Sequence, residues 1–269
     1  MDLRQFVEFH DSELTADSDV ARAEFDTRQD KSSRLARWLR SAIIDEIQRL
    51  KPHLQFLDES AFYGNDPREG DRGGERFFAL LTPVTLKKRV RLLTKLRNHL
   101  GEHPDAAGDV WWWHAKDLSR FRIVTANLHD LIAVHDMIAA LVVRLRPEGK
   151  IYLRQTPKDF IWVTPNERHN ASKSIHYLLC DEEGHIVELQ IMTLLQYSWD
   201  QIEHWLYEVQ RSVALPHPIH ASLDRSYWAL SNSLFVLDEY ILSLGRRTTR
   251  SMPKPHRRNL ERCILRRPG

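Results

Sequence analysis

The sequence predicts an α/β fold in which a mixed central sheet of about five strands is surrounded by helices. Three observations lead to this class. The N-terminal part carries apolar residues at three- and four-residue steps, which is helical spacing. The middle of the chain alternates strand-like and helix-like segments, and two β-rich runs there are joined by a short polar turn that ends in glycine. Helices should therefore pack on both sides of strands that run in both directions.

The first predicted elements are helical. Ser32 or Ser33 can cap a helix whose buried face recurs at helical steps, formed by Leu35, Trp38, Leu39, Ala42, Ile43 and Ile47. The polar, glycine-rich residues 64–78 favour an exposed loop. Residues 82–85 should open a second helix that stops at Gly101. Its apolar face would consist of Leu86, Val90, Leu93 and Leu100.

The middle of the chain supplies the first strands. One strand should follow Asp117, and residues 159–163 suggest another. Asn127 can cap a helix that runs to about Arg146.

A hairpin and two helices complete the predicted fold. Residues 174–180 and 185–193 are β-rich, and Gly184 between them can adopt the positive φ of a tight turn. Residues 194–211 and 221–244 have helical patterns. Strand alternation places two polar residues of the second β-rich run, Glu188 and Gln190, on one face, opposite its apolar side chains.

The composition indicates a soluble globular protein. With 269 residues, of which 42% are hydrophobic, the chain can bury a sizeable core. Its longest clean apolar run, residues 138–143, is far shorter than the roughly 18 to 20 residues of a membrane span. The N-terminus lacks the apolar centre of a secretory signal. A cytoplasmic location is expected, in the cell of origin or, after delivery, in a target cell. Cys180 and Cys263 have no partner at metal-ligand spacing, which argues against a zinc ribbon.

Six short motifs occur in order between residues 76 and 210. They are TPVTLKKR at 82–89, DLSRFRI at 117–123, KDFI at 158–161, SIH at 174–176, ELQIMT at 188–193 and IEHWLYE at 202–208. They resemble, in the same order, the motifs of the RelA/SpoT synthetase family. Any one of them is a weak signal, whereas the ordered set is specific.

The resemblance implies a nucleotidyltransferase-like fold and an ATP:nucleotide 3′-pyrophosphokinase, a transferase that makes alarmones such as (p)ppGpp. It implies Mg²⁺ as the cofactor, held by Asp117 and Glu188, because this hard cation prefers carboxylate and phosphate oxygens. Glu188 would also accept the proton of the attacking hydroxyl. These two carboxylates are the expected catalytic and metal-binding residues.

The same motifs imply the surrounding site. The ATP-binding residues would be Thr85, Lys88, Arg89 and Arg122, and Lys87 is a further candidate for the phosphates. The acceptor-binding residues would be Lys158, Lys173, His176 and Gln190. Glu203 and His204 would orient the site by hydrogen bonds, from a helix whose packing face contains Trp199, Ile202, Trp205 and Leu206.

The sequence departs from the family pattern in both substrate loops. Ala79 and Leu81 stand where the family carries two cations before the ATP helix. Ser172 takes the place of a tyrosine that stacks on the guanine of the acceptor, and a serine cannot stack on a base. In addition, Met192 replaces an arginine and Arg120 replaces a glycine. The resemblance therefore leaves the acceptor unassigned.

Three functions remain open. The first is a divergent pyrophosphokinase, with a toxin as one possibility, whose acceptor is an adenine nucleotide or the 3′ end of an RNA. The second is an ordinary (p)ppGpp synthetase that has rebuilt its base contacts with Arg168, His169 or Tyr177. The third is a nucleotide- or RNA-binding module without turnover. The N-terminal helices lack the His and His-Asp pairs of the family's hydrolase domain.

The C-terminal end carries an uneven charge. Residues 246–269 contain nine Lys and Arg and a single acid, with prolines that interrupt any helix. Such a tail is expected to be flexible, and it can either contact RNA by counterion release or remain solvated. A homo-oligomer and an antitoxin or immunity partner are further expectations. The predicted division is an N-terminal helical segment at 1–75, a synthetase core at 76–215, a helix at 216–245 and the tail at 246–269.

Overall fold

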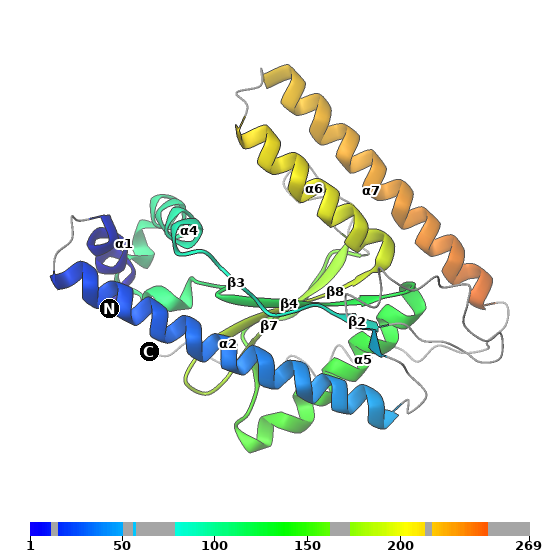
Figure 1. Ribbon diagram of the computed structural model, residues 1–269, viewed down its shortest axis with the longest axis horizontal. Helices are drawn as coiled ribbons and strands as arrows, with labels where there is room; N and C mark the ends of the chain where they lie inside the picture. Colours follow the sequence, from blue (N-terminus) through cyan, green and yellow to red (C-terminus); the bar gives the residue numbers. More distant parts are fainter. Residues whose placement is uncertain (12–15, 51–55, 58–78, 162–172, 213–216, 247–269) are drawn as a thin grey trace.

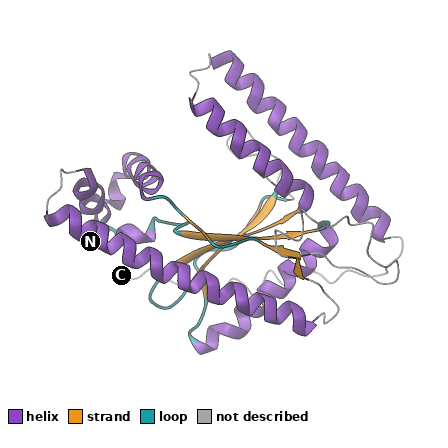
Figure 2. Cartoon of the chain, in the orientation of Figure 1, coloured by secondary structure: helices purple, strands orange, loops and turns teal. Residues whose placement is uncertain are grey.

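The computed structural model describes residues 1–11, 16–50, 56–57, 79–161, 173–212 and 217–246. Within these ranges the chain forms one sheet with helices on both faces (Figures 1 and 2). The predicted α/β class is confirmed. The predicted loop at 64–78 and nearly all of the basic tail lie outside the described residues.

Helices and strands alternate along the chain. In chain order they are α1 (Leu3–Asp11), α2 (Ala16–Leu50), β1 (Phe56–Leu57), β2 (Ala79–Leu81), β3 (Thr85–Leu86), α4 (Arg89–Glu102), β4 (Ser119–Thr125), α5 (Leu128–Leu145), β5 (Tyr152–Leu153), β6 (Lys158–Asp159), β7 (Ser174–Cys180), β8 (Ile186–Thr193), α6 (Leu194–Ser212) and α7 (His217–Arg246). Short 3₁₀ turns at Pro104–Gly108, Trp111–Trp113 and Arg146–Glu148 complete the described chain.

The sheet has the strand order β1-β2-β4-β8-β7-β5, with β3 also paired to β4 and β6 to β7. The central pair, β4 and β8, is parallel, and β7 and β8 form the predicted antiparallel hairpin. The sheet has eight strands in the described part of the chain, against about five expected. Four of them are only two residues long, which is too short to leave a periodic pattern in a sequence.

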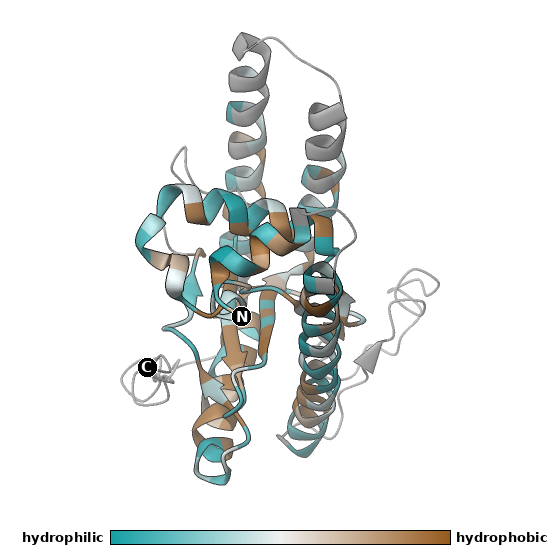
Figure 3. Ribbon diagram, turned by 90° about the vertical axis from the view of Figure 1, so that its left-hand side faces the viewer, coloured by the Kyte–Doolittle hydropathy of each residue, from teal (hydrophilic) through white to brown (hydrophobic). Residues whose placement is uncertain are grey.

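The main hydrophobic core lies on the face of the sheet that α2 and α5 cover. Leu39 and Ile43 of α2 and Ile138 of α5 are at most 1% exposed there. Asn127 caps α5 as predicted, since its side-chain oxygen accepts a hydrogen bond from the Asp130 backbone N–H. The strands are largely hydrophobic, as Figure 3 shows. On the opposite face α6 begins at the end of β8 and then runs outward beside α7 (Figure 1).

The start of the N-terminal helix was predicted incorrectly. Helix α2 begins at Ala16, so Ser32 and Ser33 lie in its interior rather than at a cap. Both serines are buried. The Ser32 hydroxyl contacts Ser119 of β4 and the carbonyl of Ile186 in β8. A serine in mid-helix is explained by a tertiary contact that the local pattern cannot reveal.

The second predicted helix also begins later than expected. Thr85 and Leu86 pair with Arg120 and Ser119 as strand β3, and α4 starts at Arg89. Leu86 and Val90 are exposed, and the buried face consists of Leu92, Leu93 and Leu96. Residues 85–86 are extended because they pair with β4. The helix therefore begins after them, and a different set of residues forms its buried face.

The hairpin agrees with its prediction. Strands β7 and β8 occupy nearly the expected residues, and Gly184 in the turn has a φ of +78°. A Cβ at Gly184 would lie 2.4 Å from a ring carbon of Trp112, so glycine is required both for conformation and for space. The strand expected at 159–163 is described only as β6, and residues 162–163 lie outside the described chain.

Candidate active site

Two rows of polar side chains cross one face of the sheet. Residues that pair directly on neighbouring strands point to the same face. The first row joins Thr85 of β3, Arg120 of β4 and Glu188 of β8. The second row, two residues further along, joins Arg122, Gln190, His176 and Lys158. The fold thus brings six residues of the predicted site together, and Arg120 joins them.

Asp117 lies at one end of this face, in the turn before β4. Its Oδ2 atom contacts the ammonium of Lys87 and lies 3.1 Å from that of Lys95. Its Oδ1 atom is buried, and none of the described residues forms a hydrogen bond with it. Burial opposes the negative charge, but Lys95 and Lys87 outweigh it and hold the pKa of Asp117 below its usual range. The carboxylate is ionised at neutral pH, with one oxygen open to a further positive group.

Glu188 is held by a short chain of side chains from the hairpin. Its Oε1 atom lies 3.3 Å from Nδ1 of His176, whose Nε2 is 2.7 Å from the Ser174 hydroxyl. Burial raises the pKa of Glu188, yet His176 more than compensates, so that this pKa lies below its usual range. The charge of Asp117 also acts on Glu188, which places the two carboxylates in one electrostatic environment. Glu188 is therefore a fixed, ionised oxygen donor.

Arg122 connects the sheet to α6. Its Nε donates a hydrogen bond of 2.9 Å to the side-chain oxygen of Gln190, and a terminal nitrogen lies 2.8 Å from Oδ2 of Asp200. Burial lowers the pKa of Arg122, whereas Asp200 opposes that shift. An arginine at this position is typical of a phosphate or base contact, but it also fixes the helix that follows β8.

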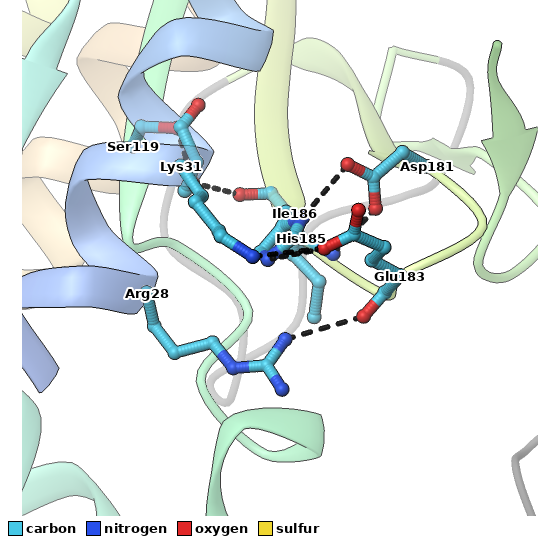
Figure 4. Close-up of polar contacts among 8 residues, drawn as sticks. Arg28, Lys31, Ser119, Asp181, Glu183, His185 and Ile186 are labelled. Atoms are coloured by element: carbon cyan, nitrogen blue, oxygen red, sulfur yellow. Dashed lines mark hydrogen bonds and ion pairs between the residues drawn. The ribbon is translucent and has the colours of Figure 1, made fainter. Parts of the chain in front are cut away.

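Helix α2 supports strands β4 and β8 from behind. The Ser32 hydroxyl lies 2.6 Å from that of Ser119, two residues after Asp117, and contacts the Ile186 carbonyl, two residues before Glu188. Figure 4 shows Ser119 and Ile186 beside a second group at the β7–β8 turn. There Lys31 lies 2.9 Å from a carboxylate oxygen of Glu183. Sequence reasoning missed this support, because the partners are far apart in the chain.

The predicted ATP-binding residues fall into two places. Thr85 and Arg122 belong to the polar sheet face, whereas Lys88 and Arg89 line a cavity of about 550 Å³ between α2 and the start of α4. Burial lowers the pKa of His10 in α1, and the nearby positive charge of Arg89 lowers it further. Lys87 lines the same cavity and reaches Asp117, so it connects the two places.

Two of the candidate acceptor-binding residues lie apart from the polar face. Lys173 is buried, with its ammonium 4.7 Å from the ring of Phe235 in α7. Tyr177 faces the main core, where its hydroxyl lies 2.6 Å from Nδ1 of His135. A tyrosine in that position cannot contact a base on the opposite face. Arg168 and His169 lie outside the described residues.

The expected packing face of α6 is only partly correct. Trp199 is buried, but Ile202 and Trp205 are 51% and 65% exposed because the helix leaves the sheet after its first turns. Glu203 is half-buried on α6. The side chains of His204 and Leu206 lie outside the described residues, so the positioning role of Glu203 and His204 stays a prediction.

The donor atoms suit a hard cation. Asp117 and Glu188 both offer ionised carboxylates, and within the described ranges Oδ1 of Asp117 has no hydrogen-bond partner. The described residues contain no group of three or more His, Cys, Asp or Glu arranged to hold a metal ion. Further ligands for Mg²⁺ would have to come from water and from phosphate oxygens.

None of the helices in the described residues is both long and apolar enough to span a membrane. The chain has no match among curated proteins. Among solved structures it is similar to the small alarmone synthetase 1 of Bacillus subtilis bound to its product pppGpp, with 19% identity, a TM-score of 0.43, and coverage of 64% of this chain and 78% of that chain. The small alarmone synthetase 2 of the same organism has 20% identity and a TM-score of 0.44, with coverage of 61% of this chain and 80% of that chain.

A GTP pyrophosphokinase family protein of Streptococcus pneumoniae gives 18% identity, a TM-score of 0.41, and coverage of 62% of this chain and 76% of that chain. These likenesses are weak, so the family assignment depends on the sequence. A family model described as "Region found in RelA / SpoT proteins" matches residues 86–212, which carry the polar sheet face and five of the six motifs. The resemblance is confirmed, and the chain carries a RelA/SpoT domain.

Proposed function

We propose that this chain is a Mg²⁺-dependent pyrophosphokinase that transfers the pyrophosphoryl group of ATP to the 3′-hydroxyl of a nucleotide or of an RNA 3′ end. The observation that carries the proposal is the polar sheet face, on which Glu188, Arg122 and His176 lie together beside Asp117. Membership of residues 86–212 in the RelA/SpoT family supports the same reaction.

In this reaction the 3′-oxygen of the acceptor attacks the β-phosphorus of ATP. The bond from that phosphorus to the oxygen bridging the α- and β-phosphates breaks, and AMP leaves. The hydroxyl proton passes to Glu188 and then to water. Asp117 and Glu188 would hold Mg²⁺, which supplies positive charge against the phosphate oxygens when bound.

The other residues position the substrates. Arg120 and Arg122 present two guanidinium groups on the face where phosphates would lie, and such positioning is the main source of catalysis in phosphoryl transfer. His176 fixes the orientation of the Glu188 carboxylate. Lys158, at the end of the second row, would contact the acceptor. The burial of Tyr177 supports an acceptor other than guanine, since this ring cannot replace the missing stacking partner.

The test is incubation of the full chain with Mg²⁺ and ATP labelled in the β or γ phosphate, in the presence of GDP, GTP, ADP, AMP or bulk tRNA. We expect label on at least one acceptor, and no label with Glu188→Gln or Asp117→Asn. An adenine nucleotide or tRNA as the acceptor would support the divergent enzyme, and GDP or GTP would support an ordinary (p)ppGpp synthetase.

A nucleotide- or RNA-binding module without turnover is the second candidate. The observation in its favour is that the ammonium groups of Lys87 and Lys95 already form ion pairs with Asp117, the expected metal ligand. Binding of ATP or RNA by calorimetry, with no labelled acceptor in any reaction, would contradict the enzyme and support the binding module.

The basic tail is a separate part of the proposal. Removal of residues 246–269 should lower the affinity for RNA and flatten its dependence on salt, because fewer phosphates would be neutralised. Unchanged RNA affinity after this truncation would exclude the tail as the contact. We also propose that the tail contacts either a delivery system or an antitoxin or immunity partner. The same truncated variant can be used in cells to test both contacts.

A further inference from the structure

The charge balance around Asp117 is unusual for a metal ligand. Two ammonium groups, those of Lys87 and Lys95, approach the same carboxylate oxygen. The three side chains together carry one net positive charge, and this balance is unchanged when Glu188 and Arg120, which share the same environment, are included. A free divalent cation would be repelled by this group, whereas a polyphosphate would be attracted to it. The arrangement therefore suits a nucleotide-bound metal better than a free one.

The backbone on both sides of this contact is held by hydrogen bonds, whereas the two lysine side chains are long and have rotatable bonds. Leu118, next to Asp117, is buried, and its carbonyl accepts a hydrogen bond from the backbone N–H of Lys87. Gln29 of α2 donates to the Lys87 carbonyl. The backbone of Lys87 is thus held from both sides, and only its long side chain can swing. The Lys95 side chain on α4 is 61% exposed, which allows it to turn away without loss of packing.

We propose that Lys87 and Lys95 act as an exchangeable counter-ion for Asp117, which they neutralise in the nucleotide-free protein and leave for the phosphates when a metal–nucleotide complex binds. The metal would then enter with the nucleotide rather than before it. This inference rests on the proposed function, since it assigns the order in which the same site is filled.

The exchange has a physical cause in the burial of Lys87. Its side chain is only 17% exposed, so the ammonium needs an anionic partner close by. When a metal ion takes Asp117, a phosphate oxygen can replace the lost carboxylate. Metal and nucleotide should consequently strengthen each other's binding, and by the same factor.

The experiment measures Mn²⁺ binding to the full chain without nucleotide, by the electron paramagnetic resonance signal of free Mn²⁺. Wild type should bind weakly. Lys87→Met should raise the affinity about tenfold, because a neighbouring charge of this kind typically shifts a carboxylate equilibrium by that order. Lys95→Met should give a smaller gain of about threefold, since this lysine is more exposed.

Lys150→Met is the matched control. It removes the same charge from an exposed lysine that pairs with Glu148 just before β5, apart from the polar sheet face. Its Mn²⁺ affinity should stay close to that of wild type. Adding Asp117→Asn to Lys87→Met should abolish the gain. An affinity for Lys87→Met equal to that of Lys150→Met, or tight Mn²⁺ binding by the wild type that Asp117→Asn removes, would overturn the proposal.

A second measurement repeats the titration with a non-hydrolysable ATP analogue. The analogue should raise Mn²⁺ affinity strongly in wild type and much less in Lys87→Met or Lys95→Met. If Lys87→Met does not fold, Lys95→Met decides the question alone, because its side chain is largely in solvent. The metal titrations need no turnover. A protein that labels no acceptor but shows the exchange contradicts the proposed function only, and one that labels an acceptor without the exchange contradicts this inference only.

Discussion

The two faces of the β4–β8 pair differ in polarity over the central residues of the strands, although the same strands supply both. On one face Phe121, Ile123, Leu189 and Ile191 are at most 1% exposed and pack against α2 and α5. On the other face the alternate residues Arg120, Arg122, Glu188 and Gln190 form the polar rows. The comparison indicates that stability and chemistry are assigned to opposite faces, so substitutions should separate the two properties.

The largest separation is expected for Glu188→Gln on the polar face. This change removes the group that accepts the hydroxyl proton, and the rate of acceptor labelling should fall by roughly a thousandfold or more. The amide is nearly the same size, so the urea midpoint of unfolding should hardly change. A variant that loses activity only in proportion to lost folded protein would show that Glu188 acts structurally.

The opposite result is expected for Ile123→Ala on the apolar face. Truncation of a fully buried isoleucine should lower the free energy of unfolding by about 3 kcal/mol. The labelling rate per folded molecule should remain within about twofold of wild type, since no polar contact is removed. Denaturant unfolding and activity on the same sample measure both quantities. Val20→Ala, at a site 59% exposed on α2, serves as the control for a change outside the core.

Ser32→Ala should affect both stability and activity, because Ser32 links α2 to the strands that carry the polar face. It removes the buried hydroxyl that bonds to both the Ser119 hydroxyl and the Ile186 carbonyl, which should cost about 2 kcal/mol of unfolding free energy, although Ser119 still donates to the Ser32 backbone carbonyl. Because these atoms flank Asp117 and Glu188, the labelling rate should fall as well. Ser226→Ala removes an exposed serine hydroxyl from α7 and should change neither quantity. Equal stability of the two variants would contradict the supporting role of Ser32.

The smallest effect is expected for Glu46→Gln, within the helical layer. Arg49 and Arg144 bond to Glu46, and despite burial they lower its pKa to about 2 from an unfolded value of about 4.5. At pH 7 the variant should be less stable by about 1 kcal/mol. Since the folded pKa is depressed, this contribution exists above pH 4.5 and is lost as the pH falls toward 2. Thermal unfolding of both proteins from pH 7 to 3 should show the difference shrinking.

Much of the polar face could be predicted because it depends on local order. The alternation in β8 places Glu188 and Gln190 together, and the hairpin turn at Gly184 places β7 beside β8. Asn127 marks the start of α5 by the same local chemistry. Asp117 and Arg122 were predicted from the family motifs, because the periodicity of the sequence cannot show that they lie near Glu188. The failures are equally specific, since Ser32, Lys95 and Asp200 act through partners on distant elements.

The sequence by itself determined the α/β class, the hairpin, the two faces of β8 and the family of residues 86–212. Each of these depends on the order of neighbouring residues, because side-chain direction follows backbone periodicity. Only the tertiary structure decided which charges meet Asp117, that α2 supports both β4 and β8 through Ser32, and that Tyr177 faces the core. Those contacts join groups separated by 22 to 154 residues, as in the pairs Lys95–Asp117 and Ser32–Ile186. Chain folding alone brings such groups together, so their partners cannot be read from local sequence.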